Sequence, residues 1–145
     1  MRPADRRSAS LARVKITQAL IDEMVAHARE DLPNECCGML GGSGGEARTL
    51  IRVANSAASP LRYEMDPQEQ YNALKSIEEG GEELLAIYHS HTKSAAYPSQ
   101  TDVNQAVAWP EQVYVIVSLA DSDAPDVKAF LLADLKIADV ELDVT

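Results

Sequence analysis

Two histidines one residue apart precede a serine and an aspartate that are separated by two residues. His89-Ser90-His91 is followed, after seven residues, by Ser99-x-x-Asp102. In an extended strand alternate side chains point to the same side, so His89 and His91 can bind one ion while Ser90 points away. Imidazole suits Zn²⁺, and a catalytic zinc takes three protein ligands and a water. The spacing therefore predicts one zinc ion per chain, bound by His89, His91 and Asp102.

Each half of this pattern has an ordinary explanation when it is taken alone. A His-x-His pair recurs by chance, and Ser-x-x-Asp is more typical of a capping box at a helix N-terminus. Their combination, directly after the apolar segment 84–88, favours metal binding. For the Ser90 side chain there are two alternatives: it forms hydrogen bonds that fix the loop, or it is simply exposed to solvent.

A hydrolytic zinc site also needs a general base, and Glu35 is the candidate. Glu35 comes directly before the apolar segment 36–40. A carboxylate at the start of a buried strand is costly unless it has a partner. A solvated glutamate at a strand end is the alternative.

The elements that must position these residues mix strands and helices without a regular β-α-β alternation. We expect helices over 20–28, capped by Thr17, over 67–79 and over 99–107. Apolar and β-branched segments predict strands at 14–16, 36–40, 48–53, 63–65, 84–88, 113–119, 127–132 and 135–144. The pattern predicts the α+β class, with a mixed, mostly antiparallel sheet flanked by helices.

Composition limits what the chain can be. It has 145 residues, 46% of them hydrophobic and 25% charged, which predicts one folded domain. We assign 1–12 to a flexible polar tail and 13–145 to the catalytic domain.

The net charge of −10 argues against a nucleic-acid partner. No segment has the ~20 apolar residues that span a bilayer. The sequence shows no secretory signal, so we expect a cytoplasmic protein without a membrane partner.

Glu35, the His89-Ser90-His91 triplet and Ser99-x-x-Asp102 together resemble the signature of the JAMM (MPN+) metalloprotease family. The likeness runs from Val14 onward. It is most similar to the small bacterial members that release cysteine from a sulfur-carrier protein, through the stretch that begins Tyr88-His89-Ser90-His91-Thr92 and continues as Ala96-Tyr97-Pro98-Ser99-x-Thr101-Asp102-Val103. The resemblance implies the JAMM/MPN (cytidine-deaminase-like) fold. It also implies zinc on His89, His91 and Asp102, Glu35 as the acid/base, and Ser99 as a group that stabilises the tetrahedral intermediate.

The same resemblance implies a substrate. Family members cut amide or isopeptide bonds after the Gly-Gly tail of ubiquitin-like proteins, so the expected partner is a small ubiquitin-like sulfur carrier ending in Gly-Gly. Thr92 stands where many relatives have proline, and the chain has no room for the long insertions of eukaryotic deubiquitinases. The alternatives are a deubiquitinase-like isopeptidase, a small-substrate amidase, or a non-catalytic MPN pairing module.

Several other residues have both a functional and a purely structural interpretation. Tyr97 could line the substrate channel or pack against the metal loop. Cys36 and Cys37 suggest a thiol protease, but buried cysteines are usually small hydrophobes. The glycines at 41–45 are more typical of a hairpin turn than of a phosphate loop, and His27 is predicted to lie on the surface. The acidic residues at 78–79 and 82–83 could attract a basic carrier, and the first helix could form a homodimer.

Overall fold

In the described part of the chain, residues 13–145, seven strands form one mixed sheet, which closes into a barrel in the order β1-β3-β2-β4-β5-β6-β7. The computed structural model describes residues 13–145, and the predicted N-terminal tail lies outside them. The strands are β1 (Arg13–Ile16), β2 (Cys37–Ser43), β3 (Glu46–Val53), β4 (Glu83–His91), β5 (Val113–Ser118), β6 (Asp126–Leu131) and β7 (Ala138–Val144). The helices are α2 (Gln18–Glu30), α3 (Pro67–Glu79), α4 (Gln100–Gln105) and the short 3₁₀ helix η1 (Ala106–Ala108).

The sheet is mixed, as the sequence predicts. β2 pairs antiparallel with β3 and β4, and β6 pairs antiparallel with β5 and β7. β4 runs parallel to β5, and β1 runs parallel to both β3 and β7. The barrel closes through β1, because this N-terminal strand lies between the hairpin strand β3 and the C-terminal strand β7.

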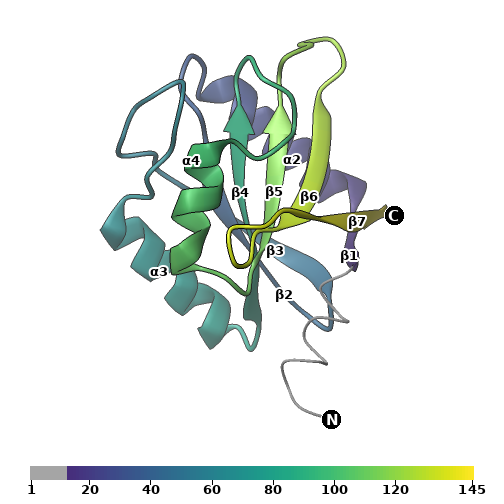
Figure 1. Ribbon diagram of the computed structural model, residues 1–145. Coiled ribbons are helices and arrows are strands. Elements are labelled where there is room, and N and C mark those ends of the chain that lie inside the picture. Colours follow the sequence, from purple (N-terminus) through teal and green to yellow (C-terminus); the bar gives the residue numbers. More distant parts are fainter. Residues whose placement is uncertain (1–12) are drawn as a thin grey trace.

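Helices cover both faces of the sheet, and each face has its own core. Figure 1 shows α2 on one side of the sheet and α3 and α4 on the other. Ile21, Met24 and Ala28 of α2 pack in one cluster of buried residues. Ala73 of α3 and Val103 of α4 belong to a second cluster. The central strand β4 is therefore buried on both faces: Ala86 and Tyr88 belong to the first cluster and Ile87 belongs to the second.

Local signals in the sequence place the main elements. The Thr17 hydroxyl accepts a hydrogen bond from Leu20 N at 3.2 Å and caps α2. Asp66 caps α3, whose first residue is Pro67. Gly44 and Gly45 have φ of +60° and +77°, which a two-residue hairpin turn requires. The predicted β2–β3 hairpin is thus confirmed, and the phosphate-loop alternative is not.

Several element ends differ from the sequence expectations, and three of the differences change the character or the start of an element. The helix expected at 99–107 is α4 followed by η1. The last strand begins at Ala138 rather than at 135, because Asp134 and Leu135 adopt positive φ of +55° and +60° in a turn. The short strand expected at 63–65 is a single bridge between Asn55 and Met65.

The prediction that His27 lies on the surface is wrong. His27 is 4% exposed, and its Nδ1 lies 2.7 Å from the hydroxyl of Tyr88. Gly38 on β2 makes room for this tyrosine, since a Cβ at Gly38 would lie 2.3 Å from the Tyr88 ring. His27 is buried because it pairs with Tyr88 of the sheet. The periodicity of a helix carries no information about a partner on another element.

Two further expectations concern a homodimer through the first helix and a membrane-spanning segment. The apolar side of α2 faces the sheet, with Leu20 and Val25 partly buried against the same core, so a homodimer through this helix stays a prediction. Within residues 13–145, no helix has the length and apolar character needed to cross a membrane.

Candidate active site

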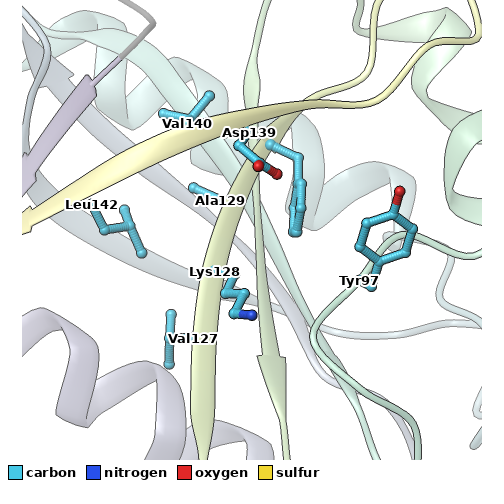
Figure 2. A pocket seen from close by; sticks show the side chains of 8 residues that line it. Tyr97, Val127, Lys128, Ala129, Asp139, Val140 and Leu142 are labelled. Carbon is cyan, nitrogen blue, oxygen red and sulfur yellow. The ribbon is translucent and has the colours of Figure 1, made fainter.

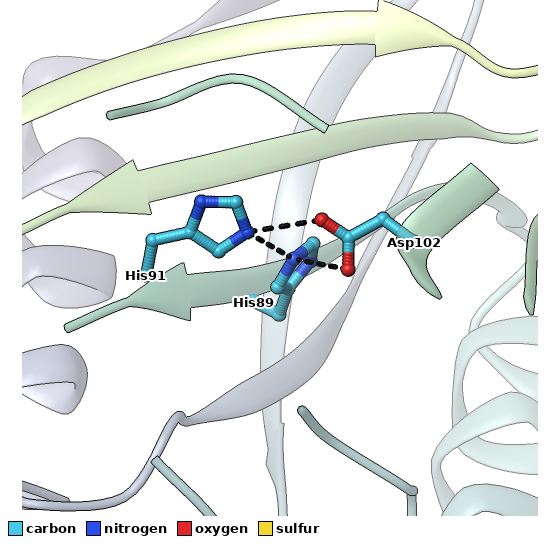
Figure 3. A group of neighbouring side chains, drawn as sticks. All are labelled: His89, His91 and Asp102. Atoms are coloured by element: carbon cyan, nitrogen blue, oxygen red, sulfur yellow. Dashed lines mark hydrogen bonds and ion pairs between the residues drawn. The ribbon is translucent and has the colours of Figure 1, made fainter. Parts of the chain in front are cut away.

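The predicted metal ligands converge at the carboxyl end of β4 (Figure 3). His89 Nε2 and His91 Nε2 lie 3.3 Å apart. Asp102 Oδ1 lies 3.2 Å from His89 Nε2, and Asp102 Oδ2 lies 2.9 Å from His91 Nε2. All three side chains are buried, at 0%, 4% and 5% exposure.

The spacing of these donor atoms fits a tetrahedral zinc ion. Bonds of about 2.0–2.1 Å at tetrahedral angles place ligand atoms roughly 3.3 Å apart. The two Nε2 atoms are 3.3 Å apart, and each lies 2.9–3.2 Å from one oxygen of the Asp102 carboxylate, which is close to that value. His91 Nδ1 also lies 2.8 Å from Ala95 O, which orients the ring so that Nε2 faces the other donors. The residues present therefore fit a His₂Asp zinc site.

Strand alternation and a helix cap bring the three ligands together. On β4, His89 and His91 share one face of the sheet, and the ring of Tyr63 stacks on His89 with centroids 4.6 Å apart. Ser99 and Asp102 form a capping box at the start of α4. Ser99 Oγ accepts from Asp102 N at 3.1 Å, and Ser99 N donates to Asp102 Oδ2 at 2.9 Å. The capping and metal explanations of Ser99-x-x-Asp102 are thus both satisfied by one geometry.

The two histidines keep the Asp102 carboxyl ionised. Burial by itself would raise the pKa of Asp102, but hydrogen bonds from His89 and His91 outweigh burial and hold it well below its usual value. Burial would lower the pKa of His91, and the hydrogen bond to Asp102 raises it instead. The triad thus presents an anionic ligand between two imidazoles.

Glu35 is buried beside this triad, not solvated at a strand end. It is 4% exposed, and its Oε1 has no hydrogen-bond partner. Burial raises its pKa to about 7, with His91 opposing the shift. Glu35, His91 and Ser99 line one cleft of about 450 Å³. A carboxylate with an unpaired oxygen and a pKa near neutrality has the properties of a general base.

Ser90 and Asn55 both hold the peptide unit that joins Glu35 to Cys36. Ser90 Oγ accepts from Cys36 N at 2.8 Å, which confirms the hydrogen-bonding alternative for Ser90. Asn55 donates through Nδ2 to Glu35 O at 3.0 Å and to Arg62 O at 3.1 Å. Sequence reasoning missed Asn55 and the stacking Tyr63, since a lone asparagine after a strand indicates only a turn.

Tyr97 lies outside the cleft that holds Glu35. Its side chain is 56% exposed, and its ring meets Phe130 edge-on with centroids 5.6 Å apart. It borders a separate hollow formed with β6 and β7 residues such as Lys128 and Asp139 (Figure 2). Contact between Tyr97 and a substrate thus remains a proposal, whereas packing of Tyr97 on the neighbouring strand is observed.

The adjacent cysteines do not have the properties of nucleophiles. Both are free and fully buried, and they lie in opposite cores. Burial raises the pKa of Cys36 to about 12 and raises that of Cys37 further. Neither forms a thiolate near neutral pH, so the thiol-protease alternative has no support in the structure.

A buried His-His-Asp set at a strand end, with a buried glutamate in the same cleft, defines a metallohydrolase centre. The family described as prokaryotic homologs of the JAB domain matches residues 17–133. The chain belongs to this JAB/MPN (JAMM) family and is a JAMM metallopeptidase.

Individual relatives agree with this assignment. The CysO-cysteine peptidase of Mycobacterium tuberculosis is 38% identical over 127 residues, which cover 86% of each chain. The desampylase of Haloferax volcanii is 40% identical over 115 residues, 74% of this chain and 81% of that protein. The solution structure of a Desulfitobacterium hafniense protein matches with a TM-score of 0.83 at 35% identity, covering 91% of this chain and 92% of that one.

Proposed function

We propose that the protein hydrolyses the amide bond after the C-terminal Gly-Gly of a small ubiquitin-like sulfur carrier and thereby releases cysteine. The observation that carries the proposal is the single cleft lined by Glu35, His91 and Ser99 beside the buried ligand set. The relative from Mycobacterium tuberculosis, named for a CysO-cysteine substrate, supports the choice of substrate. The free, reduced Cys36 and Cys37 support a cytoplasmic setting.

The site residues divide the chemistry among them. When bound to His89, His91 and Asp102, zinc supplies Lewis acidity and lowers the pKa of water towards ~7. Glu35 takes the proton of the attacking water through its unpaired oxygen and delivers it to the leaving amine.

Ser99 has a free donor for the oxygen that becomes negative. Its Oγ already accepts a hydrogen bond from Asp102 N, so its own proton is available for the scissile carbonyl. A donor at such a position typically contributes roughly 10²–10³ in rate. The capping box fixes the direction of this hydroxyl before substrate binds.

A Gly-Gly tail suits a site enclosed in this way. The ligands lie between a strand end and a helix start, and they are nearly fully buried. An extended peptide must therefore approach closely, and glycine allows this because it has no Cβ to clash.

The second candidate is an isopeptidase that cuts the same tail from a lysine side chain. The relative named desampylase, 40% identical, supports this alternative. A small-substrate amidase without a protein carrier is the third. The first two differ in what is attached after Gly-Gly, the third acts on a substrate without that tail, and all three require the same site residues.

Mass spectrometry of CysO-cysteine before and after incubation with the zinc-loaded enzyme tests the proposal. We expect the carrier to lose one cysteine and to keep its Gly-Gly end. Asp102→Ala, which removes a metal ligand, is the matched control and should leave the substrate intact. An intact carrier, together with ready cleavage of a lysine conjugate or of a short peptide, would replace the proposal with the second or third candidate.

A further inference from the structure

A lysine stands on the rim of the active-site cleft. The lining residues of this cleft are Glu35, Pro60, Leu61, His91, Thr92, Lys93, Ser94 and Ser99. Among the lining residues from the described range 13–145, Lys93 is the only lysine or arginine. Its side chain is exposed, and no ion pair joins it to a carboxylate within residues 13–145.

The backbone that carries Lys93 is held on both sides. The Thr92 hydroxyl donates to Pro60 O at 3.3 Å. On the other side, Ser118 Oγ donates to Ser94 O at 2.6 Å, and Ala95 O lies 2.8 Å from His91 Nδ1. Because its neighbours are anchored to other segments, Lys93 leaves the loop from a fixed position beside the metal ligands. Less entropy is then lost when its ammonium binds a ligand than on a mobile loop.

The charge of the cleft indicates that the Lys93 ammonium favours a substrate with a free carboxylate near the scissile bond. The chain carries a net charge of −10, and Glu35 lies in the same cleft. A single residue attached through its amine to Gly-Gly carries a free α-carboxylate one residue from the scissile bond. Glu35 and the net negative charge of the chain disfavour this carboxylate, and an ammonium on the rim offsets part of that repulsion. A lysine conjugated through its side chain, inside a protein, brings no carboxylate to this place.

We infer that Lys93 binds the α-carboxylate of the released residue and selects carriers that end in one extra amino acid over isopeptide conjugates. Pro60 and Leu61, which is 83% exposed, form the apolar part of the same rim and contact the side chain of that residue. This inference rests on the proposed cleavage after Gly-Gly and names the substrate class within it. Lys93 is a specificity-determining residue, because it acts on the substrate outside the bond that breaks.

The test compares two forms of one substrate. CysO-cysteine is prepared with a free C-terminal carboxylate and as the C-terminal amide, and kcat/KM is measured for both. The variants are Lys93→Gln and a matched control, Lys75→Gln, which removes an exposed lysine from α3, away from the cleft lining. We expect the unmodified enzyme to prefer the free carboxylate about fivefold, the upper range for an exposed ion pair. Lys93→Gln should abolish the preference by raising KM for the free carboxylate, while Lys75→Gln should keep it.

A binding measurement separates recognition from hydrolysis. In the Glu35→Gln background, calorimetry should give the same fivefold ratio of Kd between the two forms, and adding Lys93→Gln should remove it. Equal kcat/KM for the two forms, or a preference that survives Lys93→Gln, overturns the role of Lys93 and leaves the proposed cleavage standing. If the unmodified enzyme cleaves neither form, both the proposed function and this inference are overturned.

Discussion

Replacing Glu35 by glutamine should abolish hydrolysis and, at the same time, stabilise the metal-free protein. Glu35 is buried with one oxygen unpaired, and burial raises its pKa from 4.5 to about 7. Ionising it in the folded state therefore costs stability. A glutamine of the same shape fills the site without a charge, and it cannot accept a proton. The rate should fall by roughly 10²–10⁴, the usual contribution of a general base.

The gain in stability follows from the linkage between protonation and folding. A carboxyl whose pKa is raised in the folded state binds more protons there than in the unfolded state, so stability falls as the pH rises between about 4.5 and 7. With ~1.4 kcal/mol per tenfold change, the full cost above pH 7 is about 3 kcal/mol. We expect Glu35→Gln to recover about 2 kcal/mol of it, because the buried amide is still polar.

Thermal unfolding in the presence of a chelator measures this effect. At pH 8 the Glu35→Gln variant should melt about 4–8 °C above the unmodified protein, and most of the difference should vanish at pH 5. Added zinc should shrink the difference, since a nearby cation favours the ionised carboxylate. A variant that is less stable at pH 8, or equally shifted at both pH values, would refute the argument from burial. Retention of near-normal kcat would show that the base lies elsewhere.

Three further outcomes test other parts of the structure. Elemental analysis should find about one zinc per chain in the unmodified protein. The Asp102→Ala variant should lose most of this zinc because it lacks one of three ligands. Full zinc occupancy in Asp102→Ala would contradict the ligand set. Ser90→Ala leaves the buried Cys36 N–H without its acceptor, so chemical denaturation should show a loss of about 1–3 kcal/mol, and an unchanged midpoint would disprove it. Burial lowers the pKa of His27 below 6.5, so the unfolded state takes up the extra proton and stability should fall as the pH drops through about 6.5. His27→Gln should lose this part of the pH dependence, as unfolding midpoints between pH 5 and 8 will show.

The sequence alone determined the features that depend on neighbouring residues. The alternation of a strand places His89 and His91 on one face. The spacing of Ser99 and Asp102 is that of a capping box, and the structure confirms it. The glycines after β2 predict the hairpin, because a two-residue turn needs positive φ. These signals are short-range, so no knowledge of the fold is needed to recognise them.

Only the tertiary structure decided the features that join distant segments. Glu35 lies more than fifty residues before His89, and the pairing of β2 with β4, together with the Asn55 hydrogen bonds, fixes its place beside the ligands. Tyr97 is next to the metal loop in sequence, yet its ring packs on Phe130 of β6. His27 has the spacing of a helix flank, but Gly38 lets Tyr88 reach it. In each case the outcome depends on which side chain another strand presents, and periodicity within one segment carries no information about that.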